Sequence, residues 1–353
     1  MPGFTGAVIL VTGGAGFVGS ALIRRLLEAR PRQVVIVDNM LSSDIAAVPE
    51  HPALDLRLGS IADDRVLAAL PGNLEYVFHL ACYHGNQSSI HDPLADHQNN
   101  TLTSLKLFEW AKDLSSLKKL VYAAAGCAVA EKTFGAAAAT PEDAPVSLFH
   151  DSPYSISKLI GEMYGNYYFT RHRLPFVRAR FQNVYGPGEI LGAGRWRGTP
   201  HTVWRNVTPT FIWKALRREA LPVENGGIAS RDFIFVDDIA QGLIACAARG
   251  VPGESYNLAS GVETTILDLA DLINELTKNP MPIALKPPRD WDSSGRRFGD
   301  PTKAKEELGF AAATELRDGL TQTIAWTRTN RELIGRCMQQ HARFLPELRG
   351  AAE

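Results

Sequence analysis

A glycine-rich turn between two apolar segments dominates the first part of the chain. The apolar run 7–11 leads into the glycine-rich stretch 12–20, an amphipathic segment follows at 21–27, and a second apolar run, 33–37, ends at Asp38. Continuous apolar runs of this length are typical of strands buried on both faces of a parallel sheet. Glycines between a strand and a helix let a pyrophosphate approach the backbone, where the helix N-terminus offers free N–H groups. This order of segments predicts a dinucleotide site.

The acid at the end of the second run indicates which dinucleotide binds. Asp38 lies 19 residues after Gly19, close to the roughly 20 at which an acid meets the adenosine ribose diol. Asp38 would repel a 2′-phosphate, and Asn39 supplies no compensating arginine. We therefore predict NAD as the cofactor. The expected contacts in this half of the chain are Gly13, Gly16, Phe17, Val18, Gly19, Asp38, Asn39, Ser60, Ile61, Leu80 and Ala81.

Further apolar runs alternate with helical stretches along the chain. They lie at 56–61, 76–81, 119–123 and 176–181. Alternating strands and helices predict an α/β fold with a doubly wound parallel Rossmann sheet. Residues 231–238 are expected to return to this sheet.

The composition changes after about residue 186, where Gly, Trp and Arg are frequent and no apolar period is present. Such a stretch predicts a long binding loop. Because 353 residues are many for one domain, we expect two connected domains. We assign 1–185 to the NAD-binding domain, with returning segments at about 230–260. A smaller C-terminal α/β substrate cap is expected to comprise 186–229 and 261–330, followed by a mostly helical, exposed tail at 331–353.

The charge and composition exclude several classes of partner. A net charge of −1 gives no reason to expect nucleic acid or an anionic membrane, and no apolar run approaches the roughly 18 residues of a membrane helix. The N-terminus has no signal-peptide pattern. The four cysteines and nine histidines are dispersed without a metal-binding spacing. We expect a cytoplasmic protein without a catalytic metal.

Tyr154 and Lys158 form the candidate catalytic pair. On a helix, residues four apart lie on one face. An ammonium near a phenol favours the phenolate, so it lowers the pKa of the tyrosine from about 10. The spacing alone is common, and it gains meaning only beside a cofactor.

Together these residues resemble the extended short-chain dehydrogenase/reductases that epimerise or dehydrate nucleotide-diphosphate sugars. The resemblance rests on the glycine motif 12–19, the Tyr154/Lys158 pair and the segments 183–187 and 231–233. Residues 83–91 and 124–127 are similar to NAD-dependent nucleotide-sugar epimerases of bacterial O-antigen loci, which implies a role in surface polysaccharide synthesis.

The resemblance implies a mechanism and a set of ligands. Tyr154 would remove a proton from a sugar hydroxyl while NAD takes the hydride, usually at position 4, and Lys158 would bind the nicotinamide ribose. Asn100 would lie near the cofactor. Asn183 and Arg231 would bind the diphosphate of a UDP- or GDP-linked sugar, with Arg297 or its neighbour Arg296 as a second clamp. A homodimer through helices near 100–113 and 153–172 is also implied.

One departure from the family affects the catalytic centre. The position where these enzymes carry Ser or Thr is here Ala125, which cannot donate a hydrogen bond. The contact would be absent, or come from Ser88, Ser89 or a water. Gly126 and Cys127 occupy the place of the Asp-Glu pair of the dehydratases, which disfavours elimination of water.

Cys127 itself opens an alternative. It falls where relatives that epimerise carbons 3 and 5 of a 4-keto sugar carry a catalytic cysteine, so it is a candidate acid/base. A free cysteine is also commonly a small buried hydrophobe. The sequence is compatible as well with a net dehydrogenase and with a non-catalytic NAD-binding protein. For the sugar itself we expect contacts from Gln87, Ser88 and Ser89, in the loop after the run 76–81.

Overall fold

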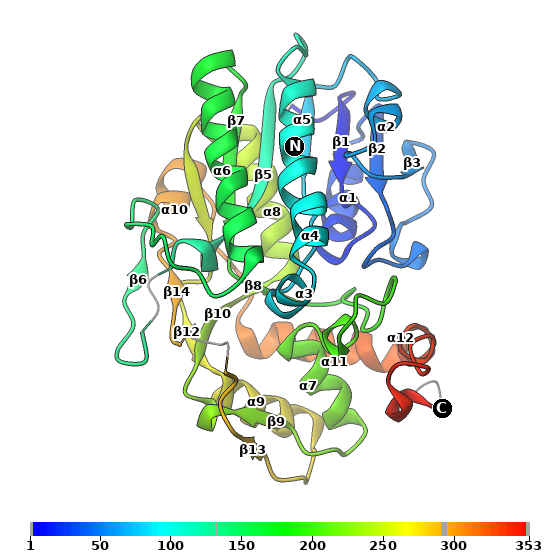
Figure 1. Cartoon of the computed structure of the whole chain (residues 1–353), viewed down its shortest axis with the longest axis vertical. Coiled ribbons are helices and arrows are strands. Elements are labelled where there is room, and N and C mark those ends of the chain that lie inside the picture. The colour runs from blue at the N-terminus through cyan, green and yellow to red at the C-terminus, as the bar shows by residue number, and fades with distance from the viewer. Residues whose placement is uncertain (1–2, 131–132, 291–294, 351–353) are drawn as a thin grey trace.

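A seven-stranded parallel sheet forms the centre of the molecule. The structure, a computed structural model, describes residues 3–130, 133–290 and 295–350 (Figure 1). The strand order is β11-β7-β5-β4-β1-β2-β3, and every neighbouring pair is parallel. The predicted doubly wound Rossmann sheet is confirmed. Its strands are β1 (Val8–Thr12), β2 (Gln33–Asp38), β3 (Leu54–Leu58), β4 (Tyr76–His79), β5 (Lys119–Ala125), β7 (Phe176–Phe181) and β11 (Ser255–Leu258).

The order of the strands reverses beside β1. The chain runs outwards from β1 through β2 to β3, and β4 then pairs with the other edge of β1. The loops that follow β1 and β4 therefore diverge at the carboxyl ends of these strands. In an open parallel sheet this divergence leaves a crevice that binds ligands.

Helices cover both faces of the sheet (Figure 1). α1 (Phe17–Glu28) and α8 (Val236–Arg249) contribute to one apolar cluster, and α5 (Thr103–Ala111) and α6 (Pro153–His172) to the other. The shorter helices around them are α2 (Asp64–Ala68), α3 (Asn86–His91), α4 (Pro93–Asp96) and α10 (Thr302–Leu308).

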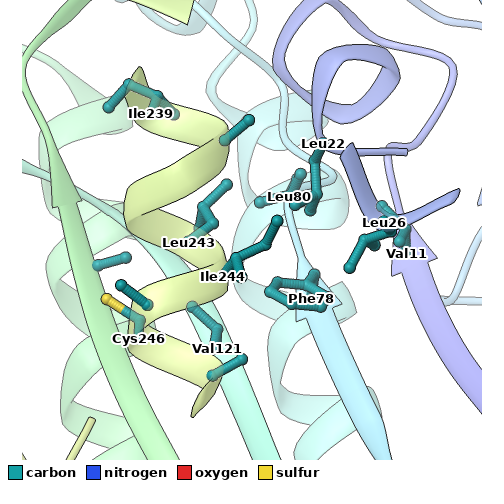
Figure 2. Packing of buried hydrophobic residues seen from close by; sticks show 14 of the residues in the cluster. Val11, Leu22, Leu26, Phe78, Leu80, Val121, Ile239, Leu243, Ile244 and Cys246 are labelled. Carbon is teal, nitrogen blue, oxygen red and sulfur yellow. The ribbon is translucent and has the colours of Figure 1, made fainter. Parts of the chain in front are cut away.

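Successive residues of β1 point to opposite faces of the sheet. Ile9 and Val11 join the cluster of α1 and α8, whereas Val8 and Leu10 join the cluster of α5 and α6. Figure 2 shows side chains of α1 and α8 meeting Val11 and neighbouring strand residues. Because both faces are buried, residues 8–11 of the strand are all apolar.

A smaller unit lies below the carboxyl end of the sheet (Figure 1). Its helices pack on one another and share a third apolar cluster, which includes Phe211, Leu269 and Leu320. Its elements are α7 (Val207–Leu216), β9 (Pro222–Glu224), α9 (Ile266–Thr277), β13 (Ala284–Lys286) and α11 (Leu316–Thr329).

The expected return of residues 231–238 to the main sheet is wrong. β10 (Ser230–Phe235) instead pairs in parallel with β8 (Asn183–Tyr185) and antiparallel with β12 (Glu263–Thr265) in a separate three-stranded sheet. The chain rejoins the main unit through α8 and β11. A further two-stranded sheet joins β6 (Ala139–Thr140) to β14 (Phe298–Gly299).

The expected exposure of the tail is also wrong. α12 (Arg331–Gln339) buries Ile334, Cys337 and Met338 against an apolar cluster that includes Leu191. Positions 334, 337 and 338 lie on one face of a helix, so the tail has an apolar stripe between its charged residues. Within the described ranges, no helix combines the length and apolar character needed to span a bilayer.

Candidate active site

A cavity of about 690 Å³ lies between the carboxyl end of the main sheet and the smaller unit. It brings together most of the residues that the sequence singles out, although contact with a ligand stays a prediction for each of them. Among its lining residues are Gly13, Gly16, Phe17, Val18, Gly19, Asp38, Asn39, Ser60, Ile61, Leu80, Ala81, Gln87, Ser88, Cys127, Tyr154, Lys158, Asn183, Arg231 and Arg297. No group of three or more His, Cys, Asp or Glu side chains in the described residues is arranged to bind a metal.

The glycine loop after β1 is packed too closely for a side chain at Gly13 or Gly19. A Cβ on Gly19 would lie 2.2 Å from the carbonyl oxygen of Gly13, and one on Gly13, at φ +72°, would lie 2.6 Å from the backbone nitrogen of Ala81. No side chain caps the N-terminus of α1, so the first-turn N–H groups are available to an anion. This cradle fits the pyrophosphate of a dinucleotide.

Asp38 is held at the mouth of this cradle. Its Oδ2 accepts a hydrogen bond from the backbone N–H of Ala15 at 3.0 Å, and its Oδ1 accepts bonds from the N–H of Met40 and the hydroxyl of Ser43, both at 2.9 Å. The carboxylate is therefore fixed in orientation beside the loop, as binding of an adenosine ribose diol requires.

Tyr154 and Lys158 lie in the first turns of α6. Ser152 begins the helix by accepting a hydrogen bond from the N–H of Ser155. The Lys158 ammonium donates to the carbonyl oxygen of Ala123 at 2.8 Å and lies 6.0 Å from the centre of the Tyr154 ring. Burial raises the pKa of Tyr154 well above its ordinary value. The expected lowering of this pKa is therefore not seen in the polypeptide alone, where desolvation is the largest cause and disfavours the charged phenolate.

The structure does not bring Ser89 to the cavity. Its hydroxyl accepts a hydrogen bond from the backbone N–H of Tyr154 at 3.1 Å and donates one to the carbonyl oxygen of Asn86 at 2.7 Å. Ser89 thus ties α3 to the first turn of the catalytic helix. Its predicted contact with the sugar has no support from this geometry.

Asn100 lies behind the catalytic helix rather than on the cavity wall. Its side-chain oxygen accepts from the N–H of Tyr83 at 2.6 Å, and its amide donates to Asp96 at 2.7 Å and to Ser157 at 3.1 Å. It belongs to a π-helical turn, His97–Leu102, which continues into α5. Such turns often occur at functional sites, and contact between Asn100 and the cofactor stays a prediction.

Ala125 and Cys127 line the cavity next to Tyr154. Ala125 ends β5, Cys127 lies in the following 3-10 turn, and both contribute to a small apolar cluster with Tyr154. No hydroxyl is attached at the end of β5. The nearest side chain along the chain with a proton to give is the Cys127 thiol, a weak donor.

The structure distinguishes the two candidate clamps on the cap side. Arg296 forms a two-bond ion pair with Glu263, at 2.8 and 2.9 Å, and does not line the cavity, whereas Arg297 does. Arg231, on β10, also lines the cavity, and its guanidinium donates to the carbonyl oxygens of Ser230 and Gly295, each at 2.6 Å. Of the two, only Arg297 therefore lies where it could reach a ligand in this cavity, and its role as a clamp stays a prediction.

The loop 186–206 contributes to the cavity wall and packs against the segment after Asp38. The N–H of Arg195 donates to the carbonyl oxygen of Leu41 at 3.0 Å, and the guanidinium of Arg205 donates to that of Ser42 at 2.9 Å. In the tail, the side-chain amide of Gln340 donates to the carbonyl oxygen of Gly192 in this loop at 2.7 Å. The tail therefore holds the loop that packs on the segment after Asp38.

Sequence reasoning overlooked some polar residues of this loop. Glu189 and Arg205 line the cavity, and burial raises the pKa of Glu189 to about 7. The frequency of Gly, Trp and Arg after residue 186 signals a binding loop, but it does not single out Glu189 or Arg205.

His84, in the segment after β4, is a further residue that the sequence suggested could reach the sugar. It lines the cavity, and its ring packs edge-on against that of Tyr154, with 5.7 Å between the ring centres. Burial lowers the pKa of His84 to about 3.

Comparison with known proteins agrees with this geometry. Residues 9–259 match the model of the NAD dependent epimerase/dehydratase family. A solved structure of the Bordetella bronchiseptica enzyme WbmF in complex with NAD+ and UDP is 58% identical, with a TM-score of 0.87 over 96% of this chain and 98% of that one. The UDP-glucose 4-epimerase of Mycolicibacterium smegmatis is 31% identical over 326 residues, which are 90% of this chain and 98% of that protein.

A relative with a different activity is similar over the same length. The dTDP-glucose 4,6-dehydratase of Streptomyces antibioticus is 28% identical over 333 residues, 92% of this chain and 93% of that protein. Both activities lie within the one family. The chain therefore belongs to the NAD-dependent epimerase/dehydratase family, and it is an enzyme whose cofactor is NAD.

Proposed function

We propose that this chain epimerises a UDP-linked sugar through a transient keto sugar, with Tyr154 as the acid/base. One observation carries the proposal: Tyr154 and Lys158 lie in one cavity with the glycine loop on one side and Arg231 and Arg297 on the other. A nucleotide sugar held by those arginines would extend towards Tyr154. The solved complex of WbmF with NAD+ and UDP supports UDP as the nucleotide, and a GDP-linked sugar is the alternative.

The chemistry is redox-neutral overall. When bound, NAD would supply the acceptor and donor for a hydride at the sugar carbon. Tyr154 removes the hydroxyl proton as the carbonyl forms and gives it back on reduction. Inversion follows when the keto sugar presents its other face before reduction. The Lys158 ammonium, held by the Ala123 carbonyl, is placed to bind the nicotinamide ribose and to favour the tyrosinate.

The diphosphate is assigned to the cap side of the cavity. Asn183 on β8 and Arg231 on β10 lie on adjacent paired strands, with Phe233 opposite Asn183 in the register. Guanidinium groups bind phosphate oxygens through charge-assisted hydrogen bonds. Arg297 adds a second cation to the same wall. We therefore assign these three residues to the nucleotide and Gln87 to the sugar.

A panel of nucleotide sugars tests the proposal directly. The purified NAD-bound protein is incubated with UDP-, GDP-, dTDP- and CDP-sugars in deuterated water and followed by NMR. Epimerisation of a UDP-sugar at one carbon, without NADH accumulation, is the expected result. An absence of conversion across the panel would contradict it and favour a non-catalytic NAD-binding role.

A second candidate is epimerisation at carbon 3 or 5, for which Cys127 is the acid/base. The observation that favours it is the position of Cys127 on the cavity wall against Tyr154. This route exchanges a carbon-bound proton with solvent, whereas hydride return does not. Solvent deuterium at a sugar carbon, lost in Cys127→Ser, would establish it. Undiminished incorporation in that variant would eliminate it.

We also propose a homodimer built on α5 and α6. One face of α6 exposes Ile156, Met163 and Tyr167 to 44%, 54% and 54%, at spacings of seven and four that place them in one stripe. α5 runs beside α6 in Figure 1. Light scattering of the wild type and of Met163→Glu tests this assembly: the variant is expected to be monomeric.

The wider context extends the same proposal. The resemblance of residues 83–91 and 124–127 to epimerases of O-antigen loci supports a cytoplasmic step in surface polysaccharide synthesis. The division into an NAD-binding unit, 1–185 with 230–260, and a cap, 186–229 with 261–330, is likewise proposed. Loss of the surface polysaccharide in a deletion strain, restored by the wild type but not by Tyr154→Phe, is the expected outcome.

A further inference from the structure

We propose that Ser88 supplies the hydroxyl missing at Ala125, by donating a hydrogen bond to the sugar oxygen that exchanges its proton with Tyr154. This inference rests on the proposed function. Ser88, Ser89 and a water are the candidates for this donor, and we choose Ser88 because it lines the cavity, whereas Ser89 does not.

Ser88 is buried and unpaired. Its side chain is 1% exposed, and its Oγ has no hydrogen-bond partner among the described residues. Buried hydroxyls nearly always have a partner, so an unpaired one calls for an explanation. Ser88 also lines the cavity together with Ala125 and Tyr154. A ligand oxygen in that cavity is a partner that the polypeptide itself does not offer.

Ser89 cannot take this role, because both of its hydrogen-bonding functions are already in use. It accepts from Tyr154 and donates to Asn86, and it is absent from the cavity wall. The same bonds fix α3 against the first turn of α6. Ser88 is the adjacent residue of α3, so it is held in a constant position relative to Tyr154 without bonding to it.

No hydrogen bond to the described residues fixes the direction of the Ser88 hydroxyl. Rotation about χ1 moves Oγ among three staggered positions, and no protein hydrogen bond has to break. A donor of this kind stabilises the negative charge that develops on the sugar oxygen as its proton leaves. The Ser or Thr of related enzymes would act from the end of β5, and Ser88 acts from α3 on another wall of the same cavity.

Relocation of a hydroxyl gives a sharp experiment. Ser88→Ala, Ser88→Cys, Ser88→Thr and the double variant Ser88→Ala/Ala125→Ser are prepared as NAD-bound proteins and assayed on the UDP-sugar that the wild type converts. Ser88→Ala and Ser88→Cys are expected to lower kcat by about 10²- to 10³-fold, the usual effect of removing one such donor, with little change in KM. Ser88→Thr keeps the donor and should retain most of the activity.

The double variant separates catalysis from structure. Adding Ala125→Ser to the Ser88→Ala enzyme is expected to raise kcat at least about tenfold over that of Ser88→Ala alone, because it returns a hydrogen-bond donor to the same cavity. The acid limb of the kcat–pH profile should move to higher pH in Ser88→Ala and return in the double variant, since the donor favours the deprotonated sugar oxygen. Ser89→Ala is the matched control. This variant should lower the thermal stability of the protein, and adding Ala125→Ser should not restore that stability.

Two results overturn the proposal. One is a kcat for Ser88→Ala within threefold of the wild type, which would assign the contact to water. The other is a folded, NAD-bound Ser88→Ala enzyme of low activity that Ala125→Ser fails to improve. Failure of the proposed function looks different, because the wild type itself would then convert no UDP-sugar and would not reduce its bound NAD on mixing.

Discussion

Glu162 and Arg180 form a buried ion pair that joins the catalytic helix to the sheet. The Arg180 guanidinium donates two hydrogen bonds to the carboxylate, at 3.0 and 2.8 Å, and the two side chains are only 4% and 5% exposed. Glu162 lies one turn beyond Lys158 on α6, and Arg180 lies on β7. The pair therefore sets where the helix that carries Tyr154 rests on the strands.

Removal of one partner should be costly. Glu162→Gln leaves the Arg180 charge buried without its counter-ion, and Arg178 lies close to the same carboxylate at 3.9 Å. The free energy of unfolding in urea is expected to fall by about 3–5 kcal/mol. Glu275→Gln is the control, because its pair with Arg317 is exposed and should change stability little. Equal losses in the two variants would contradict the structural role of the buried pair.

Tyr154→Phe should abolish turnover while leaving the cofactor in place. The phenol oxygen is the proposed acid/base, so its removal should lower kcat by about 10²- to 10⁴-fold. The glycine loop and Asp38, which are predicted to bind the other end of NAD, are untouched. NAD released on denaturation should match that of the wild type. A variant that loses NAD would show instead that Tyr154 is needed chiefly for binding.

The two neighbouring arginines should differ in their effect on nucleotide binding. Arg297 lines the cavity, so Arg297→Met should weaken UDP binding at least about tenfold, as expected for loss of a hydrogen bond to a charged group. Arg296 pairs with Glu263 outside the cavity, so Arg296→Met should change UDP affinity by less than about twofold. Calorimetric titration with UDP distinguishes them. An equal loss of UDP affinity in both variants would show that Arg297 does not bind the nucleotide.

These residues also show where sequence reasoning reaches its limit. The glycine loop and Asp38 could be predicted because strand, turn, helix and acid follow one another within 38 residues and act through local geometry. Arg296 and Arg297, or Ser88 and Ser89, are adjacent in the sequence and chemically equivalent. Only the direction of each side chain in the folded protein decides which residue of a pair bonds to a neighbouring protein group and which one lines the cavity.

Long-range packing explains the remaining errors. The segment 230–235 has the composition of a buried strand, which the main sheet could accommodate, but it pairs with β8 and β12 instead. The tail has many arginines, a composition that predicts exposure, yet Ile334 and Met338 complete an apolar cluster with the loop 186–206. In both cases the partner lies far away along the chain, and composition does not specify it.

His79 should make the stability of the protein depend on pH. Its ring is buried at the end of β4 between the hydroxyls of Thr12, at 2.7 Å, and Ser104, at 3.0 Å. Burial lowers its pKa to about 3, whereas an unfolded histidine has a pKa of about 6.5. Below pH 6.5 the unfolded chain therefore binds a proton that the folded chain does not. The contribution of His79 is complete above pH 6.5 and is lost as the pH falls towards 3.

Between pH 7 and pH 5 this residue alone should lower the free energy of unfolding by about 2 kcal/mol. His79→Asn keeps a polar side chain in the site, but this side chain does not titrate. The free energy of unfolding of the variant should therefore fall by about 2 kcal/mol less than that of the wild type between pH 7 and pH 5. Urea titrations of both proteins at pH 7 and pH 5 measure the difference. Because each protein is compared with itself, any overall destabilisation by the substitution cancels. An identical pH dependence in both proteins would show that the His79 ring is protonated in the folded state.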